Sequence, residues 1–448
     1  MKTDKYRRLL SCCPSLLDAA DKTANDKNGA LQNNIPAQVT AYVTAPVLFC
    51  YVCYILDSVK KNNINRIFFL SRDGYILKQI ADIIIERKKL KIQTSYLYVS
   101  RYSLRNALYY KCETAEDFEN AGLFTGYTLK SAKNFLKSAG LNDCQRVEVY
   151  KEIGFSDDEN KDLSDSEYSA FCEKIKNDPA LLCKIKNNSE NNYHNIMKYF
   201  EQSGLFEKEK IAVVDSGWMG TVQKTLTALV NGRTDENIIG YYFGLYRRED
   251  DNYKAFLFDV TDAYKYVPTF CNNLFECFCS APHGMTTGYR ECNGKIIPVL
   301  SDANTEMVKM AEIQTKTAVR FTEYACKNEN YIPICKMRDI SARLLKALMY
   351  KPDKQEAEIL GAFPFSDDVT EAKIQRLAGN CKGSISNILL PVRIIRKKKG
   401  KSIYPDKYIY WLYGSIVLTG CKPAWVYRLS VREWERLRLL RERRKLCR

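Results

Sequence analysis

Short apolar runs that lead through polar residues into amphipathic helices recur in this chain. Residues 66–70 (RIFFL) and 211–214 (IAVV) are brief, bounded and rich in β-branched or aromatic side chains, as expected for buried strands of a parallel sheet. After each run, apolar residues follow helical spacing, over 76–84 and over 222–230. The pattern therefore predicts two strand–loop–helix units.

A third apolar run, 95–99 (SYLYV), ends in Ser100 and Arg101, and residues 238–245 and 256–259 are further candidate strands. The sequence thus predicts an α/β fold with an open, mostly parallel, Rossmann-like sheet. Ligands of such sheets bind outside the carboxyl ends of the strands. We therefore expect three polar loops to converge on one cleft, namely 71–75, 100–101 and 215–221.

The segments around these strands are mainly helical in pattern. Within the region after the strands, residues 273–289 indicate a helix end followed by a polar loop, and residues 296–300 an edge strand. The predicted organisation is an N-terminal lead-in or linker (1–38), an α/β domain (39–300) with a helical insertion (about 111–205), a helical region (301–392) and a basic, aromatic tail (393–448).

The net charge of +16 is concentrated at one end of the chain. Residues 393–448 carry 17 Lys and Arg against four acids, a balance of +13, and the rest of the chain carries the remaining +3. A nearly neutral body argues against general nucleic-acid binding, so no nucleic-acid partner is expected. The basic tail predicts contact with an anionic partner.

The tail also contains aromatic residues of the kind that favour a bilayer interface. Its apolar part is too short and too broken by glycine to span a membrane. Two structures stay open: a segment that binds an anionic membrane surface, and a docked helical hairpin with a solvated basic face. The aromatic residues in question are Tyr408, Tyr410, Trp411, Tyr413 and Trp425.

Cysteine usage and the N-terminal sequence favour a cytoplasmic protein. The 17 cysteines are irregularly spaced and no N-terminal segment resembles a signal peptide, so reduced thiols are expected. The pair Cys50 and Cys53 lies alone in an apolar segment, and no second pair stands at zinc-ligand spacing. The apolar stretch 42–56 predicts one buried helix, shorter than a membrane span.

The most specific chemistry lies in residues 211–226, IAVVDSGWMGTVQKTL. An acid, Asp215, ends the apolar strand, and Gly217, Gly220 and Thr221 follow before the helix. Backbone N–H groups in such a turn, together with the positive end of the helix, can hold an anion. The simpler alternative is an ordinary strand-to-helix turn without a ligand.

Two segments, FFLSRDGYILKQIADII and IAVVDSGWMGTVQKTLTAL, resemble two loops of the type I phosphoribosyltransferases. Together with YLYVSR, they look like the phosphoribosyltransferase module of bacterial surface-polysaccharide enzymes. That family transfers 5-phosphoribose from phosphoribosyl diphosphate to a growing glycan, and a haloacid dehalogenase-like phosphatase, often fused, then removes the 5-phosphate. The resemblance covers about residues 40–300.

The resemblance implies a role for each loop. Asp215 would bind the ribose hydroxyls, directly or through Mg2+, and Ser216 stands where nucleotide-forming relatives usually carry a second acid. Arg72 would neutralise the diphosphate, Asp73 would face Mg2+ or the acceptor, and Arg101 would add a second cation. The 5-phosphate would be wrapped by Gly217, Trp218, Met219, Gly220 and Thr221, and the diphosphate would also meet Ser71 and Gly74.

An acceptor hydroxyl needs a base, for which Glu276 and His283 are candidates. Their alternatives are a helix-surface acid and a loop histidine, and Arg72 with Asp73 could form a structural ion pair. The implied partners are phosphoribosyl diphosphate, a lipid-linked glycan of a capsule or O-antigen pathway, and a separate phosphatase. A rival interpretation is a haloacid dehalogenase-like hydrolase with Ser71 at the nucleophile position, and another is a non-catalytic scaffold in the same pathway.

Overall fold

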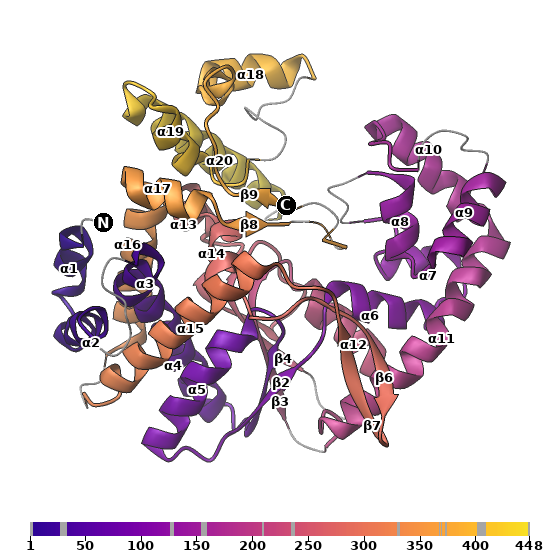
Figure 1. Cartoon of the computed structure of the whole chain (residues 1–448), viewed down its shortest axis with the longest axis horizontal. Helices are drawn as coiled ribbons and strands as arrows, with labels where there is room; N and C mark the ends of the chain where they lie inside the picture. The colour runs from indigo at the N-terminus through magenta and orange to yellow at the C-terminus, as the bar shows by residue number, and fades with distance from the viewer. Residues whose placement is uncertain are drawn as a thin grey trace.

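A five-stranded, wholly parallel sheet forms the centre of the molecule (Figure 1). The computed structural model describes the chain apart from residues 1–2, 27–33, 126–129, 154–158, 208–209, 234–237, 329–331, 367, 369, 372–373, 401–408 and 447–448. The strand order is β2-β1-β3-β4-β5. The strands are β1 (Arg66–Leu70), β2 (Gln93–Leu97), β3 (Ile211–Trp218), β4 (Ile239–Leu245) and β5 (Tyr253–Phe258). The predicted α/β class and parallel sheet are confirmed.

The strand order contains a point at which the chain changes direction across the sheet. From β1 the chain moves outward to β2, and it then returns to the other side of β1 as β3. In the register of this pair, Phe69 lies opposite Val214. The polar residues that follow both strands therefore emerge side by side, which is where ligands bind in sheets of this kind.

Successive side chains of the strands pack into two separate hydrophobic cores, one on each face of the sheet. Ile67 and Phe69 point to the face covered by α4 (Ala45–Lys61) and α5 (Gly74–Lys88). Phe68 and Leu70 point to the opposite face, because successive residues of a strand face opposite sides. That face is covered by α6 (Arg101–Leu108), α11 (Pro179–Gln202) and α12 (Thr221–Val230).

The predicted insertion between β2 and β3 is helical and has a core of its own. Phe118, Phe135 and Phe171 are each at most 1% exposed and pack within this group of helices. The long helix α11 carries the chain back to the sheet (Figure 1). The other helices are η3 (Tyr109–Lys111), α7 (Ala115–Asn120), α8 (Ala132–Ser138), α9 (Asp143–Glu152) and α10 (Asp165–Lys176).

The prediction of an N-terminal lead-in or linker is wrong for the described part of residues 1–38. Two helices, α1 (Asp4–Leu10) and α2 (Pro14–Ala24), pack into the main core. The Tyr6 hydroxyl donates to Glu356 Oε1 at 2.7 Å. The outward faces of these short helices are mostly polar, which gives the segment the composition of a linker. Its apolar residues lie on the inward faces and are buried.

One predicted helical run is longer than expected. The helices α3 (Ile35–Val39), η2 (Thr40–Thr44) and α4 are continuous. Among the residues that the structure describes, this run of 27 residues, Ile35–Lys61, is the one candidate that is long and apolar enough to cross a membrane. Of its most apolar window, 94% is buried inside the protein, and the same test is passed by core helices.

The strand predicted at 296–300 exists, but it is not an edge strand of the main sheet. It belongs to β7 (Lys295–Leu300), which pairs antiparallel with β6 (Thr286–Cys292). Part of the predicted polar loop at 273–289 is therefore strand. The two-residue turn explains the difference, because Asn293 and Gly294 both have positive φ (51° and 73°), the geometry that favours an Asn-Gly hairpin.

The predicted helical region, 301–392, starts with three helices and continues with short elements. Helices α15 (Thr305–Ala325), α16 (Ile334–Met349) and α17 (Lys354–Gly361) pack beside the N-terminal helices. A minimal hairpin, β8 (Pro364–Phe365) and β9 (Gln375–Arg376), follows. The remaining short elements are α13 (Ala263–Tyr266), η4 (Val267–Thr269), α14 (Asn272–Phe278) and η5 (Ile385–Ile388).

The C-terminal tail is docked on the body. It comprises α18 (Leu390–Lys398), α19 (Leu412–Thr419) and α20 (Ala424–Leu446). Trp411 is fully buried and its indole N–H donates to the Met349 carbonyl at 2.8 Å, and the buried Tyr413 hydroxyl donates to the Pro268 carbonyl. The interpretation of these two aromatics as bilayer-facing is thus wrong, whereas Trp425 is 65% exposed. Tyr408 lies outside the described residues.

The docked tail predicts different effects for two tryptophans of the same segment. Trp411→Ala should lower the free energy of unfolding by about 3–5 kcal/mol, because it leaves a cavity and an unpaired carbonyl. Trp425→Ala, the matched control, should change it by less than about 0.5 kcal/mol. Urea unfolding followed by circular dichroism measures both. Equal effects would show that the tail does not dock through Trp411.

Candidate active site

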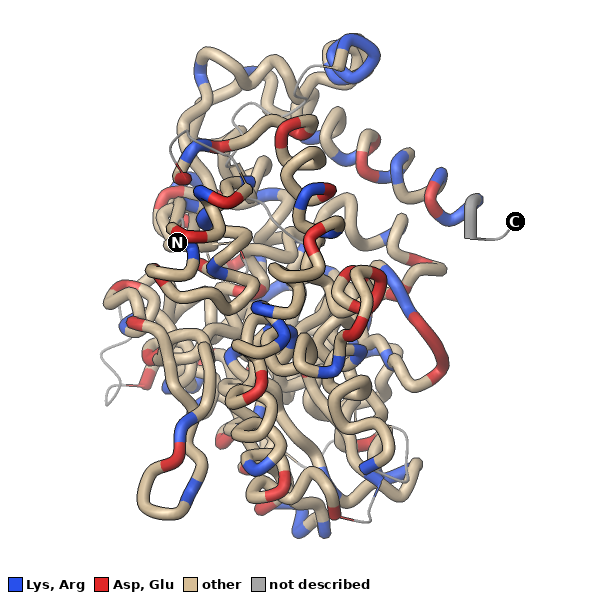
Figure 2. The backbone as a smooth tube through the Cα atoms, turned by 90° about the vertical axis from the view of Figure 1, so that its right-hand side faces the viewer, with Lys and Arg blue, Asp and Glu red and all other residues tan. Residues whose placement is uncertain are grey.

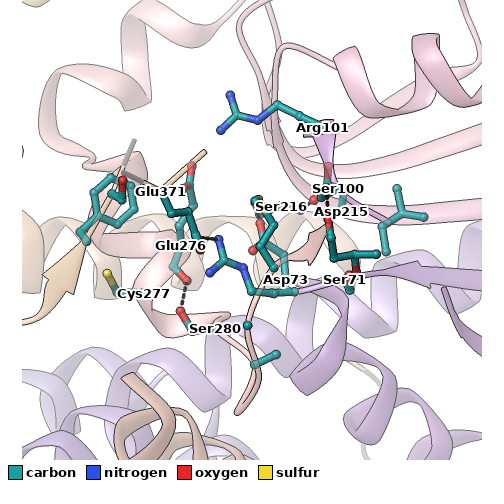
Figure 3. A pocket seen from close by; sticks show the side chains of 18 of the residues that line it. Ser71, Asp73, Ser100, Arg101, Asp215, Ser216, Glu276, Cys277, Ser280 and Glu371 are labelled. Carbon is teal, nitrogen blue, oxygen red and sulfur yellow. Dashed lines mark hydrogen bonds and ion pairs between the residues drawn. The ribbon is translucent and has the colours of Figure 1, made fainter. Parts of the chain in front are cut away.

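A pocket of about 360 Å³ opens at the carboxyl end of the sheet (Figure 3). Its walls come from the loops after β1, β2 and β3, from α14 and the loop after it, from the start of α15, and from Phe365, Ser366, Asp368, Glu371 and Ile374. The three loops predicted to converge on one cleft do line it. The predicted residues among its lining are Ser71, Arg72, Asp73, Arg101, Asp215, Ser216, Gly217, Trp218, Met219, Thr221, Glu276 and His283.

Gly74 and Gly220, which were also predicted to bind substrate, do not belong to this lining. A Cβ at Gly74 would stand 2.7 Å from the Phe69 carbonyl carbon, so this glycine lets α5 begin against β1. Gly220 has φ of +66° and precedes the first residue of α12. Both glycines therefore shape the loops behind the pocket and leave its chemistry to their neighbours.

Two carboxylates meet at the base of the pocket through one serine. The Ser216 hydroxyl donates to Asp73 Oδ2, and the Ser216 backbone N–H donates to Asp215 Oδ1 at 2.9 Å. Asp73 stands at the N-terminal cap of α5, yet its side chain does not cap that helix. Ser216 thus binds both acids and fixes their mutual orientation (Figure 3).

The environment of these acids favours their protonated forms. Loss of water on burial, followed by the nearby charge of Asp73, raises the pKa of Asp215 well above its ordinary value. Burial also raises the pKa of Asp73, although the Ser216 hydrogen bond and the charges of Arg72 and Arg101 oppose this. Two like charges in a place with little water are costly unless a proton or a cation compensates them.

The backbone around Asp215 is held by hydrogen bonds from two sides. The Tyr51 hydroxyl, on α4, lies 2.9 Å from the Asp215 carbonyl oxygen and 2.8 Å from that of Tyr241. Gly217 and Trp218 continue β3 and pair with Gly244 and Leu245 of β4. The prediction that both residues lie in the strand-to-helix turn is therefore wrong, because β3 extends to Trp218, four residues beyond the apolar run 211–214.

The turn that remains still ends in an open helix terminus. Helix α12 begins at Thr221, and its N-terminal cap, Gly220, offers no side-chain acceptor to the first N–H groups. Thr221 and Val222 both line the pocket. The first turn of this ten-residue helix therefore presents free backbone donors and a positive dipole end to an anion.

Two arginines line the pocket, one in an ion pair and the other exposed. Arg72 forms an ion pair of 2.6 Å with Glu371, so the alternative of an Arg72–Asp73 ion pair is not what the structure has. Arg101 is exposed at the start of α6, where Ser100 and Ser103 form a capping box. Within the described parts of the chain Arg101 makes no ion pair. It extends into the open space above Ser216 (Figure 3) and is available to an anionic ligand.

Glu276 is oriented by Trp218. The indole N–H of Trp218 donates to Glu276 Oε1 at 2.6 Å, and the Trp218 side chain is only 8% exposed. The ring of Trp218 packs against Phe258, Phe270 and Phe275. Glu276 is therefore part of the pocket wall, and the alternative of a helix-surface acid does not hold.

His283 is engaged at both ring nitrogens. In the tautomer that satisfies its contacts, Nδ1–H donates to the Gly284 carbonyl and Nε2 accepts from the Tyr96 hydroxyl, each at 2.8 Å. Burial lowers the pKa of this imidazole, so the neutral ring prevails at pH 7. His283 lines the pocket as a structural histidine, which agrees with the loop-histidine alternative.

Sequence reasoning missed two groups of this pocket. Thr286 is 1% exposed, and its hydroxyl has no hydrogen-bond partner among the described residues. It is held in place by its carbonyl, which accepts from the Ser100 hydroxyl at 2.6 Å. Glu371, the partner of Arg72, comes from a segment 299 residues further along the chain, and no local pattern marks it.

The donor set suits a hard cation shared with a ligand. Among the described residues there is no group of three or more His, Cys, Asp or Glu side chains that could hold a metal by itself. Mg2+ is commonly bound by one or two carboxylates together with substrate phosphates and water. Asp73 and Asp215 supply that pair, and burial, the largest cause of the raised pKa of each, makes their ionised forms costly unless a cation compensates the charge.

Comparison with known proteins gives no match, either to a protein-family model or to a curated protein.

Because the pKa of Asp215 is raised, replacing Asp215 by the neutral asparagine should increase the folding stability of the protein by an amount that depends on pH. The unfolded chain releases this proton near pH 3.8, whereas the folded chain keeps it to higher pH. Stability therefore falls as pH rises through this window, and the loss persists at pH 7. Asp215→Asn should stabilise the protein by about 0.5–2 kcal/mol at pH 7, a gain that shrinks below pH 4.

Thermal unfolding between pH 3.5 and 8 measures this effect. Asp251→Asn is the control, because the Asp251 side chain is 92% exposed and its replacement should leave the pH profile unchanged. A wild-type protein more stable than Asp215→Asn at pH 7 would contradict the unfavourable pairing of the two acids.

Proposed function

We propose that the protein transfers 5-phosphoribose from phosphoribosyl diphosphate to a glycan acceptor in bacterial capsule or O-antigen biosynthesis. The observation that carries the proposal is the joint position of two carboxylates, an exposed arginine and an uncapped helix N-terminus around one pocket. The strand order β2-β1-β3-β4-β5 is compatible with the finer fold proposal, a Rossmann-like sheet of the phosphoribosyltransferase type.

Each part of the donor has a matching group in the pocket. The 5-phosphate binds the first turn of α12, whose N–H groups and Thr221 hydroxyl donate to it. Asp215 accepts from the ribose hydroxyls, and Asp73 supplies the second carboxylate that Ser216 lacks. Asp73 and Asp215 hold Mg2+, which when bound neutralises part of the diphosphate charge.

Transfer requires that the bond between ribose C1 and the diphosphate oxygen breaks while the acceptor oxygen bonds to C1. The diphosphate leaves with the bonding electron pair, and Arg101 stabilises its charge from the side of α6. Glu276, held by Trp218, accepts the proton of the acceptor hydroxyl. The burial of Asp73 and Asp215 strengthens the charge interactions of these two carboxylates by excluding water.

The hydrolase alternative is weaker on the same geometry. The Ser71 hydroxyl donates to the Val99 carbonyl at 2.9 Å and lies 3.3 Å from the Val99 N–H. A serine held in this way and without an adjacent base is a poor nucleophile. The proposal therefore assigns removal of the 5-phosphate to a separate phosphatase.

The transfer is tested with phosphoribosyl diphosphate, Mg2+ and a synthetic or lipid-linked glycan acceptor. Wild type should add the mass of one phosphoribosyl group to the acceptor. Asp215→Ala and Arg101→Ala should each lower the rate by about 100-fold or more, as for lost transition-state contacts. Asp251→Ala, an exposed acid, should transfer at the wild-type rate. If no donor binds and Asp215→Ala equals wild type in every readout, the protein is a scaffold.

We also propose that the protein lies on the cytoplasmic membrane face and that α18 makes the contact. The exposed residues Pro391, Ile394, Ile395 and Lys398 are spaced as one helix stripe, with the isoleucines 44% and 54% exposed. Basic residues follow this stripe at 396–399, and Figure 2 has Lys and Arg gathered in the helix at its upper edge, whereas basic and acidic residues alternate along the C-terminal helix. Apolar insertion beside lysines suits an anionic leaflet.

Vesicle sedimentation tests this contact. Wild type should bind vesicles that contain phosphatidylglycerol and should bind phosphatidylcholine vesicles weakly, since each basic residue contributes about 1 kcal/mol near an anionic leaflet. The double variant Ile394→Glu and Ile395→Glu should bind about tenfold less. The control Val147→Glu changes an equally exposed residue (48%) on the insertion and should bind normally. Equal binding by both variants would remove the contact from α18.

A further inference from the structure

A second cavity adjoins the candidate active site. It has a volume of about 400 Å³ and lies between the loop before α14 and the docked tail. Tyr246 and Asn272 line both this cavity and the first one. The two spaces are therefore neighbours across a wall that these residues share with Trp218 and Phe270, whose rings are in contact at 5.3 Å.

The walls of the second cavity combine flat apolar surfaces with polar edges. Aromatic residues come from two distant parts of the sequence, and α20 adds Glu435 and Arg438, which pair with each other at 2.9 Å. The opposed charges cancel, so the cavity carries no net charge that would select an ion. The aromatic residues are Tyr246, Phe270 and Tyr410, which are partly exposed, and Trp411 and Tyr413, which are buried.

Two amides in this cavity have no hydrogen-bond partner among the residues that the structure describes. Asn273 is only 8% exposed, and neither its side chain nor that of Asn272 makes a hydrogen bond to any described residue. Both residues line the cavity at the start of α14. Neither amide is among the fully buried polar atoms that lack a partner, so both amides are accessible from the cavity and can pair with a ligand that carries hydroxyl groups.

We propose that this cavity binds the acceptor as a neutral saccharide, an inference that rests on the proposed transfer reaction. Sugar rings present apolar C–H faces that pack on aromatic rings and hydroxyl edges that pair with amides, and a pocket with aromatic walls and few polar groups fits that chemistry. A saccharide seated here would reach the first pocket past Tyr246 and Asn272. Its reacting hydroxyl would then face Glu276 beyond the Trp218 wall.

Binding and turnover test the inference on the full-length chain. The probe is an array of neutral capsule and O-antigen oligosaccharides. Wild type should bind members of the array, and Asn273→Ala should bind them about tenfold more weakly, the effect of one lost uncharged hydrogen bond. In the transfer assay the same variant should raise KM for the acceptor about tenfold and leave kcat within about twofold.

Two controls keep the outcomes distinct. Asn273→Asp nearly preserves shape and should fold if Asn273→Ala does not, and Asn187→Ala changes an exposed asparagine of α11 and should behave as wild type. Affinity for phosphoribosyl diphosphate with Mg2+, measured by calorimetry, reports on the proposed function alone and should be unchanged in all three. A wild type that binds no oligosaccharide, or variants at Asn273 that bind as wild type does, would overturn the saccharide site whatever the donor result.

Discussion

The repulsion between two carboxylates at one end of the sheet is the constraint around which the pocket is organised. Asp73 lies in the loop after β1 and Asp215 lies within β3, and Ser216, the next residue, forms hydrogen bonds with both carboxylates. The backbone hydrogen bonds of the sheet and the Tyr51 hydroxyl hold the backbone of Asp215 in place, and the hydrogen bonds of Ser216 keep the two carboxylates close together. Their charge must be compensated from within the pocket, by protons, by Arg101 or by a bound cation.

The aromatic wall around Trp218 gives the pocket its second boundary. The sequence suggests that Trp218 puts bulk into a phosphate-binding turn, but β3 continues through this residue and directs its ring into a cluster with Phe258, Phe270 and Phe275. One side of the cluster orients Glu276 through the indole N–H. The other side closes the second cavity. Trp218 thus orients Glu276 in the first pocket, and its ring contacts Phe270, which lines the second cavity.

The spacing of apolar residues along the chain predicted the strands of the main sheet and the loops that follow them. The strands at 66–70 and 211–214 and the loops after them follow from short apolar runs, and the convergence of Asp73 and Asp215 follows from parallel pairing. The hairpin at 286–300 was predictable from its Asn293–Gly294 turn, but its strands are too polar to resemble buried ones. The Arg72–Glu371 ion pair and the partnerless Thr286 hydroxyl depend on contacts between distant segments, which no periodicity contains.

The tail shows how composition alone can mislead about the same residues. Aromatic and basic residues together are typical of a membrane-facing segment, yet burial divides them into two sets. Trp411 and Tyr413 pack inside and line the second cavity, whereas the exposed isoleucines belong to α18. Arg393 and Lys397 of α18 lie over the Trp434 ring of α20, at 5.4 and 5.6 Å, and α20 also supplies Glu435 to the cavity. One helix therefore connects the proposed membrane contact with the proposed saccharide site, which is the arrangement that a lipid-linked acceptor requires.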